Sequence, residues 1–328
     1  MVIPYFNNIR QTILQSLDEA TEEIFVAVYW FTNHKLFDKL CEKVRQGKKV
    51  SLIIHNDYIN NREAGLNFQS FIDLGGQFYF SDAENPMHNK FCIIDGKTLI
   101  NGSYNWTYYA ENRNSENILV IKDELQTAVA FHAEFLKLTE QLQQVDTVKR
   151  LTKFELEEFN GLDTREYLAN DIIYEAKTTG DLSIVDSAFQ ISPLNIKVQQ
   201  KAVALDLTKK RKVKHTIGSS LVDNKYLRIV EKGTQIPITI TTIVQTVEDN
   251  QRSSGATIYY GENTAANRNI EITSLTLNGI PPKRAGEAKI KYIFTIDIYG
   301  KLSISKYSLD NGKRISSWED ITKILEDA

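Results

Sequence analysis

The chain has 328 residues, of which 42% are hydrophobic and 25% are charged, a composition typical of a globular protein with room for more than one core. Its two cysteines exclude a disulfide-based secreted scaffold, and no apolar run is long enough to span a membrane. The net charge of −3 hides an asymmetry: residues 209–328 carry 19 basic and 13 acidic side chains, whereas residues 1–145 carry 13 basic and 18 acidic ones, so a broad basic field over the first part is excluded.

The first 145 residues alternate predicted helices and strands. Apolar residues at helical spacing predict a helix near 5–19, and this segment lacks the basic start and apolar core of a signal peptide, so we expect a cytoplasmic protein. Further helices are expected over 34–47, 61–76 and 124–143, and strands over 23–31, 48–55, 77–80, 90–95, 98–102 and 117–121. This order predicts an α/β domain in which helices flank a mixed sheet.

The remainder of the chain changes character twice. Residues 146–208 show no sustained period, so we treat them as a connecting region that is partly helical, with one helix expected over 147–159. From residue 209 to 328, alternating segments separated by Gly, Pro, Asn and Asp turns predict an all-β sandwich domain. Its last segment, "SSWEDITKILEDA", has apolar residues at helical spacing and predicts a short C-terminal helix capped by Ser317.

The stretch from Met87 to Trp106, "MHNKFCIIDGKTLINGSYNW", places polar side chains at regular offsets. His88 and Lys90 are two residues apart on an expected strand, so both side chains point to the same face, and Ser103 and Asn105 have the same relation. Lysine, serine and asparagine together form a cradle for an anion such as phosphate, and histidine supplies a nucleophile or acid–base group that titrates near neutral pH.

Glu116 stands just before the next expected strand and could accept a histidine ring N–H. No group of carboxylate, cysteine or histidine residues accompanies the motif, so the sequence implies no metal and no other cofactor.

These residues resemble the signature of the phospholipase D superfamily, H-x-K-x4-D-x6-G-S-x-x-N, which Asp95 and Gly102 complete. The asparagine two positions after the serine and the "NSEN" segment at Glu116 are most similar to the small Nuc-type bacterial endonucleases, whose domain fits residues 1–145 in order and length. The resemblance implies a metal-independent phosphodiesterase, most readily an endonuclease that cleaves DNA or RNA.

The resemblance also assigns a role to each residue of the motif. His88 would attack phosphorus and form a phosphohistidine, while a second His88 protonates the leaving oxygen and then activates water. Lys90, Asn105 and Ser103 would stabilise the phosphoryl oxygens. Glu116 would orient a His88 ring, and Asp95 would support the loop rather than act directly.

That mechanism needs two histidines, but the chain contains a single H-x-K segment. The other histidines lack a downstream Gly-Ser and are expected to be ordinary surface or packing residues; they are His34, His55, His132 and His215. One motif per chain therefore predicts a symmetric homodimer with the active site on its two-fold axis. The paired imidazoles would titrate as a unit, with activity highest at mildly acidic to neutral pH.

Residues 215–313 resemble the peptide-binding β-sandwich of DnaK-type chaperones. The landmarks are Ile236-Pro237, Asp249-Asn250-Gln251, Tyr260-Gly261-Glu262, Gly279-Ile280-Pro281-Pro282, and Asp297 with Gly300. The ATPase domain and the long helical lid of that family have no counterpart. Of the positions that match its peptide pocket, Ile217 falls where the first pocket strand runs, Val244 stands where an aromatic residue is usual, and Ser254 where an apolar one is usual. The resemblance implies a peptide or protein ligand; a scaffold for docking or dimer contacts and nucleic-acid contact through the basic surface are the alternatives.

The combination predicts a nuclease joined to a recognition or regulatory module, for instance an effector in defence against foreign nucleic acid. A phospholipase or cardiolipin hydrolase is the alternative enzyme, although the chain has no basic amphipathic helix and only one motif, and we expect no membrane partner. A non-catalytic adaptor that only binds nucleic acid is the third interpretation.

Overall fold

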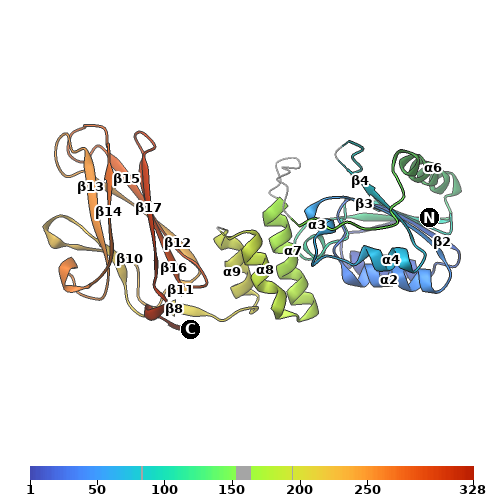
Figure 1. The fold of residues 1–328 in the computed structure, drawn as a ribbon, viewed down its shortest axis with the longest axis horizontal. Coiled ribbons are helices and arrows are strands. Elements are labelled where there is room, and N and C mark those ends of the chain that lie inside the picture. Colours follow the sequence, from blue (N-terminus) through green and yellow to red (C-terminus); the bar gives the residue numbers. More distant parts are fainter. Residues whose placement is uncertain (83, 153–163, 194) are drawn as a thin grey trace. The chain divides into compact units, whose positions relative to one another are not determined.

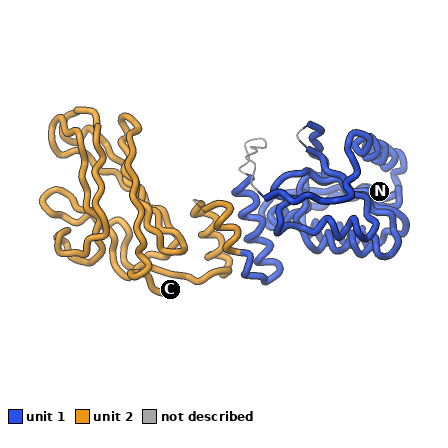
Figure 2. The backbone as a smooth tube through the Cα atoms, in the orientation of Figure 1, with its two compact units in different colours: residues 1–184 blue, residues 185–328 orange. Residues whose placement is uncertain are grey.

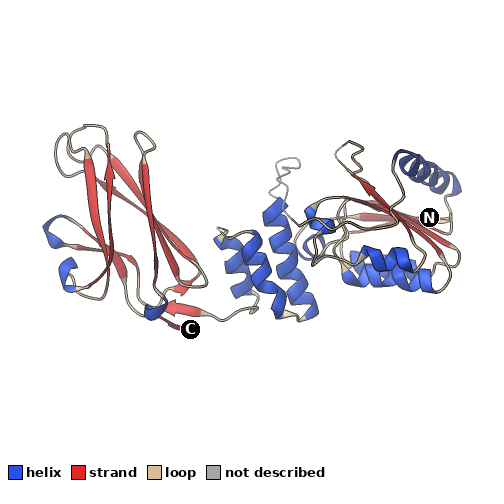
Figure 3. Ribbon diagram, viewed as in Figure 1, coloured by secondary structure: helices blue, strands red, loops and turns tan. Residues whose placement is uncertain are grey.

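A computed structural model describes residues 1–82, 84–152, 164–193 and 195–328. They form two compact units, residues 1–184 and residues 185–328 (Figure 2). The first unit mixes helices and strands, and the second consists mainly of strands (Figure 3). No helix in the described part of the chain has both the length and the apolar character needed to cross a membrane.

The first unit is built on a seven-stranded mixed sheet with the order β1-β7-β6-β5-β2-β3-β4. Figure 1 labels β2, β3 and β4 of this sheet. Its strands are β1 (Val2–Tyr5), β2 (Glu23–Val28), β3 (Lys49–His55), β4 (Gln77–Ser81), β5 (Lys90–Ile94), β6 (Thr98–Gly102) and β7 (Ile118–Lys122). The neighbours β2, β3 and β4 run parallel, and all other neighbouring pairs are antiparallel. The predicted mixed sheet is therefore confirmed.

Helices cover both faces of this sheet, so its central strands are apolar on both sides. On one face Ile24, Val26 and Val28 pack with the helices α1 (Ile9–Asp18), α2 (His34–Arg45) and α4 (Phe68–Asp73). On the other face Phe25 and Ala27 pack against α6 (Leu125–Gln141). The alternation of strand residues between two cores fixes the register, because a one-residue slip would exchange the two faces.

The first unit differs from the sequence prediction at three places. The first helix begins at Ile9, because Val2–Tyr5 form the edge strand β1 beside β7. The helix expected over 61–76 is divided into α3 (Tyr58–Asn61) and α4, which has its own cap at Asn67. The helix expected over 147–159 is not present at 147–152, and its remaining residues lie outside the described part.

The connecting region of the sequence prediction is shared between the two units. The helix α7 (Thr164–Thr179) and the short turn η1 (Leu182–Ile184) belong to the first unit, where α7 contacts α5 (Tyr108–Asn112). The helices α8 (Val185–Ile191) and α9 (Ile196–Ala204) belong to the second.

Two four-stranded antiparallel sheets, β10-β9-β13-β14 and β12-β15-β16-β17, and a three-stranded sheet, β11-β8-β18, enclose the core of the second unit. Their strands are β8 (Arg211–Val213), β9 (Ile217–Ser220), β10 (Tyr226–Val230), β11 (Gln235–Ile236), β12 (Ile238–Gln245), β13 (Ser253–Tyr260), β14 (Ile270–Asn278), β15 (Lys289–Ile296), β16 (Lys301–Ser308), β17 (Arg314–Asp320) and β18 (Leu325–Asp327). The antiparallel all-β organisation expected here is confirmed.

The prediction of a C-terminal helix is wrong. Ser317, expected as its cap, lies within β17, which pairs with β16 over seven residues, and the chain ends in η4 (Thr322–Ile324) and β18. The side chains that suggested a helical stripe, Ile321, Ile324 and Leu325, instead belong to the core of the sandwich. A helix this short is marginal by itself, so strand pairing and burial decide the outcome.

Candidate active site

The strand topology brings five of the six motif residues to one edge of the sheet. Because β5, β6 and β7 are successive antiparallel neighbours, the start of β5, the end of β6 and the start of β7 meet at the same edge. His88 and Lys90 stand at the start of β5, Ser103 and Asn105 follow β6, and Glu116 precedes β7.

Asp95 lies at the opposite end of β5, about 17 Å from Lys90 at the usual rise of a strand. Its carboxylate accepts hydrogen bonds from the backbone N–H groups of Thr21, Glu22 and Glu23 at 2.8–3.0 Å, and from the Thr21 hydroxyl. Burial alone would raise the pKa of Asp95, but these donors outweigh it and hold the pKa below its usual value. Asp95 thus fixes the chain that enters β2, away from the other five residues.

Tyr29, the residue directly after β2, contacts both His88 and Lys90. The Tyr29 and His88 rings are 4.8 Å apart and edge-on, and Lys90 Nζ lies 5.6 Å from the Tyr29 ring centre. Lys90 Nζ also donates a hydrogen bond of 2.8 Å to the backbone carbonyl oxygen of His88. The sequence motif gave no indication of Tyr29, which holds the nucleophile candidate and the cation beside each other.

A second imidazole lies on the other side of this cluster. His55, at the end of β3, stacks on Tyr29 with ring centres 4.6 Å apart, and its Nδ1 is 3.2 Å from the Ser81 hydroxyl. Only 5% of His55 is exposed, and burial lowers its pKa. This environment suits a residue that supports Tyr29 rather than one that reaches a substrate.

Ser103 and Glu116 form a hydrogen-bonded pair at the end of β6. The Ser103 hydroxyl donates to Glu116 Oε2 and accepts the backbone N–H of Asn117 at 3.2 Å. Asn114 donates to Glu116 Oε1 at 2.9 Å. Within one chain, the Glu116 carboxylate is thus held by Ser103 and Asn114, in a position from which its charge also acts on Lys90.

Asn105 is held with its amide oxygen turned toward the protein. Its side chain is 9% exposed, and its Oδ1 accepts the backbone N–H of Trp30 at 3.2 Å. The Trp30 indole N–H in turn donates to Asp57 Oδ2 at 2.6 Å. With Oδ1 occupied, the polar group that Asn105 can offer to an anion is its NH₂.

Burial at this edge of the sheet favours the uncharged forms of His88 and Lys90. Burial, and to a lesser extent the Lys90 charge, lowers the pKa of His88, which favours the neutral imidazole that a nucleophile requires. Burial also lowers the pKa of Lys90 to about 8, although Glu116 acts in the opposite direction. Two titratable groups with shifted pKa values beside each other at a strand edge are a common property of catalytic sites.

The helix α7 supports the segments on both sides of Asn105, a contribution that sequence reasoning missed. The hydroxyls of Tyr167 and Thr107 are hydrogen-bonded at 2.7 Å, and Thr107 also caps α5 by accepting the Ala110 N–H. The Tyr167 ring lies 4.3 Å from Trp30, the residue that fixes the Asn105 amide oxygen. Tyr167 is therefore a positioning residue for Asn105.

One helical turn after Tyr167, α7 carries a fully buried carboxylate. Asp171 Oδ1 accepts the backbone N–H of Tyr109 at 2.7 Å, while Oδ2 has no hydrogen-bond partner in the described part of the chain. Burial raises the pKa of Asp171 to about 6, against smaller opposing effects of hydrogen bonding and of Arg62. One turn further, Glu175 pairs with His34 at 2.9 Å.

Replacing Asp171 with asparagine should raise the free energy of unfolding by about 2–3 kcal/mol at pH 7.5 and by no more than about 1 kcal/mol at pH 4.5. In the wild type the folded pKa of about 6 lies above the unfolded value of about 3.9, so stability falls as pH rises between them. Asparagine keeps the acceptor for Tyr109 without a charge. Urea unfolding of the first unit, followed by the fluorescence of buried Trp30, measures the difference at pH 4.5 and 7.5.

Asp123→Asn, the same change at an exposed site, is the matched control and should show no such pH dependence. An equal stability gain for Asp171→Asn at both pH values would contradict the assignment of a destabilising buried charge.

The three residues expected to line a peptide pocket are not brought together. Ile217 is fully buried opposite Tyr260, whereas Ser254 lies six residues away on β13, about 20 Å along the strand. Val244 belongs to the other sheet, opposite Ile290. Ser254 accepts hydrogen bonds from the buried Lys306 ammonium, which sits inside the sandwich.

No three His, Cys, Asp or Glu side chains are grouped so that they could hold a metal ion, within residues 1–82, 84–152, 164–193 and 195–328. The donors that can contact an anion at the sheet edge are instead the Lys90 ammonium and the Asn105 amide, since the Ser103 O–H is donated to Glu116.

Two family models match the chain. Residues 13–139 match the model described as "Cardiolipin synthase, PLD-like domain", and residues 204–325 match the model described as "Hsp70 protein". The first match contains all six motif residues, and the second contains the strands β8 to β17 and the first residue of β18.

Curated relatives match one region or the other. A mitochondrial cardiolipin hydrolase of Chlamydomonas reinhardtii is 34% identical over 125 residues, which cover 38% of this chain and 55% of that protein. A chaperone protein DnaK of Thermotoga neapolitana is 34% identical over 122 residues, which cover 34% of this chain and 20% of that protein. The chain thus spans about half the length of the first relative and a fifth of the second.

Among solved structures, Nuc from Salmonella typhimurium, described as a phospholipase D family member, aligns with a TM-score of 0.42 and 24% identity. The alignment covers 45% of this chain and 99% of Nuc.

Proposed function

We propose that this chain is a metal-independent phosphodiesterase whose substrate is nucleic acid. The starting point is that it contains a phospholipase D-like domain followed by an Hsp70-like region. The observation that carries this proposal is the meeting of His88, Lys90, Ser103, Asn105 and Glu116 at one edge of the sheet. The motif spacing of the Nuc-type endonucleases and the excess of six positive charges over residues 209–328 support nucleic acid as the substrate.

The reaction would proceed in two displacements at phosphorus. The neutral His88 ring attacks, a P–N bond forms and the P–O bond to the leaving group breaks while a second imidazole donates a proton to the leaving oxygen. That imidazole then removes a proton from water, which attacks phosphorus and breaks the P–N bond. Lys90 and Asn105 donate hydrogen bonds to the phosphoryl oxygens, where negative charge accumulates, and Ser103 adds one when its O–H turns from Glu116 to the substrate.

The second imidazole is proposed to come from a second copy of the chain. His55 is buried against Tyr29, and the three remaining histidines pack or pair elsewhere: His34 with Glu175, His132 beside Phe25 and His215 beside Tyr260. A symmetric dimer would bring two His88 side chains together on its two-fold axis.

The Hsp70-like region is proposed to serve recognition or regulation, by binding a peptide or a protein. Its support is the family match over 204–325 together with the complete β-sandwich. Since Ile217 and Ser254 are separated along the sheet, a single side-chain pocket would contain at most one of them. An effector in defence, in which recognition controls cleavage, is consistent with this pairing of regions.

Lipid hydrolysis is the second candidate, because a relative named mitochondrial cardiolipin hydrolase is 34% identical over the motif-bearing region. Cardiolipin and nucleic acid share the phosphodiester that the site would hold, so the catalytic residues do not separate them. Cardiolipin and nucleic acid differ only in the groups attached to that phosphodiester, so the residues that would contact those groups decide between the two substrates.

The full-length protein should cleave labelled single- or double-stranded DNA or RNA in the presence of EDTA, and should release no product from cardiolipin or phosphatidylcholine vesicles. The donors that stabilise charge are side chains of the protein, so chelation should leave the rate unchanged. Parallel assays with and without Mg²⁺ measure both properties. If only the vesicles were cleaved, the substrate would be lipid and not nucleic acid. Loss of all activity with EDTA would contradict the metal-independent reaction.

A further inference from the structure

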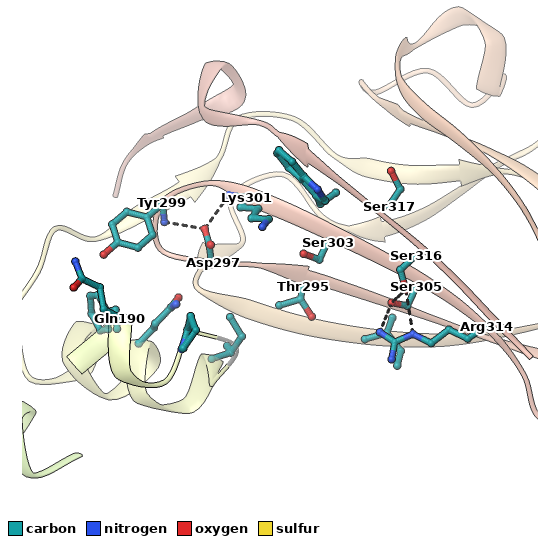
Figure 4. Close-up of a pocket in the computed structure, with 16 residues that line it drawn as sticks. Gln190, Thr295, Asp297, Tyr299, Lys301, Ser303, Ser305, Arg314, Ser316 and Ser317 are labelled. Atoms are coloured by element: carbon teal, nitrogen blue, oxygen red, sulfur yellow. Dashed lines mark hydrogen bonds between the residues drawn. The ribbon is translucent and has the colours of Figure 1, made fainter. Parts of the chain in front are cut away.

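A pocket with a volume of about 580 Å³ opens on the outer face of the β12-β15-β16-β17 sheet, within the unit 185–328 (Figure 4). One wall comes from α8, α9 and Pro193 between them; Phe189, Pro193 and Ile196 are apolar, and Gln190 and Gln199 add amides. Its volume lies in the range of small-molecule sites. It belongs to a different unit from the sheet edge that carries His88.

The floor of the pocket is a row of hydroxyl groups. Alternate residues of β15, β16 and β17 point outward, and they include Thr295, Ser303, Ser305 and Ser316. Thr295 pairs with Ser303 across the strands, and Ser305 pairs with Ser316, with their hydroxyl oxygens 2.8 Å apart. Such a floor offers neutral hydrogen-bond donors and acceptors to a ligand.

Two cations flank the hydroxyl row without a carboxylate partner in the described part of the chain. The Arg314 guanidinium lies on the floor, donating to Ser305 Oγ at 2.9 Å and Ser316 Oγ at 3.1 Å (Figure 4). Lys301 lies four residues before Ser305 on β16, about 13 Å away along the strand. The lining carboxylate, Asp297, accepts the N–H groups of Tyr299 and Lys301 in its own turn.

An exposed indole stands between the two cations. Trp318 is opposite Ser303 in the strand register and is 64% exposed. Lys301 Nζ lies 4.6 Å from the centre of its ring, so the lysine covers one face and the remaining exposure leaves the ring available for stacking. The free face of Trp318 thus lies beside two cations that carry no carboxylate partner in the described residues, which places a stacking surface and positive charge together.

We propose that this pocket binds a nucleotide unit. The base stacks on Trp318, the phosphate is held by Arg314 or Lys301, and the sugar hydroxyls bond to the serine and threonine floor. An acidic peptide would satisfy the cations, but it has no flat ring to match the exposed indole and no hydroxyl pair to match the floor. A free nucleotide and a single-stranded nucleic acid both carry this chemistry, and the experiment separates them.

Intrinsic fluorescence gives a direct readout, because Trp30 and Trp106 are 2% and 3% exposed whereas Trp318 is exposed. The full-length His88→Ala protein, which cannot consume the probe by the proposed reaction, is titrated with AMP and, separately, with a fluorescein-labelled single-stranded oligonucleotide followed by anisotropy. Binding should quench tryptophan fluorescence, and the quench should vanish in the additional variant Trp318→Phe. If AMP quenches the fluorescence, the ligand of the pocket is a free nucleotide. If only the oligonucleotide does so, the ligand is single-stranded nucleic acid.

In the same background, the one of Arg314→Gln and Lys301→Gln that removes the cation holding the phosphate should weaken binding by about tenfold or more. Lys289→Gln removes the same charge from an exposed position on β15 outside the pocket and should change the affinity by less than about twofold.

Four results would overturn the inference: no quench with either probe at millimolar concentration, a quench that persists in Trp318→Phe, an equal loss in Lys289→Gln, or displacement of the probe by an acidic peptide. The proposed function is tested independently, since cleavage by the wild-type protein does not depend on the Trp318 signal. If the wild-type protein cleaves nucleic acid but Trp318 fluorescence is not quenched, only the nucleotide pocket is rejected. If the fluorescence is quenched but no nucleic acid is cleaved, only the nuclease activity is rejected.

Discussion

Replacing His88 with alanine is expected to abolish phosphodiester hydrolysis, lowering kcat by about 10⁴-fold or more. In the proposed mechanism, the substitution removes both the atom that attacks phosphorus and, from the partner chain, the proton donor to the leaving oxygen. His88 is exposed, so the fold should survive its loss. Initial rates on the substrate that the wild type cleaves, with EDTA present, measure the effect, and a non-catalytic adaptor would keep its nucleic-acid binding and its phenotype unchanged.

His132→Gln is the matched control, because His132 lies on α6 beside Phe25 and away from the motif edge. It should retain the wild-type rate within about twofold. Co-expression provides a test of the shared site: a mixed dimer holds a single His88, so equal amounts of wild-type and His88→Ala chains should leave the wild-type chains about half as active. Undiminished activity of the wild-type chains in the mixture would reject the two-fold arrangement.

Replacing Lys90 with arginine is expected to remove the loss of rate centred near pH 8. In the wild type, burial lowers the pKa of Lys90 to about 8, so kcat/KM should fall further as pH rises through 8 and the ammonium is lost. Arginine stays charged across this range, so this step should disappear, while the changes at lower pH, set by one neutral and one protonated His88 imidazole, should remain. At pH 7 the rate should drop by about 10–10²-fold, because the planar guanidinium does not replace a compact ammonium.

Profiles of kcat/KM from pH 5 to 10 compare this variant with the wild type and with Lys97→Arg, an exposed lysine in the β5–β6 turn. The control should keep the loss of rate near pH 8. A loss near pH 8 that persists in Lys90→Arg would assign that step to another group and contradict the role of Lys90.

Strand periodicity and motif spacing were sufficient to predict the mixed sheet, the sandwich and both family resemblances, which are confirmed. They also predicted that His88, Lys90, Ser103, Asn105 and Glu116 would converge, because antiparallel neighbours bring a strand start and a strand end to the same edge. The same rule separates Asp95, which is five residues further along β5 and hence at the other edge.

The contribution of α7 to the site could not be predicted from the sequence, because Tyr167 and Asp171 contact residues about 60 positions earlier in the chain. Their spacing is that of an ordinary helix face, and almost every residue from Tyr167 to Ala176 is buried, so no amphipathic stripe marks the functional side. The prediction of a C-terminal helix was wrong for the opposite reason. Apolar residues stood at helical spacing, but the segment pairs with β16 as the strand β17 instead.

The support that α7 gives to Asn105 bears on how the protein can be shortened. A fragment ending at residue 145, where the strand–helix alternation stops, would leave the Trp30 indole and the Thr107 hydroxyl facing water in place of Tyr167. The smallest fragment that keeps the proposed activity should therefore extend to Ile184, the end of the first compact unit. Deletion series and limited proteolysis would then show catalysis lost well before the motif itself is reached.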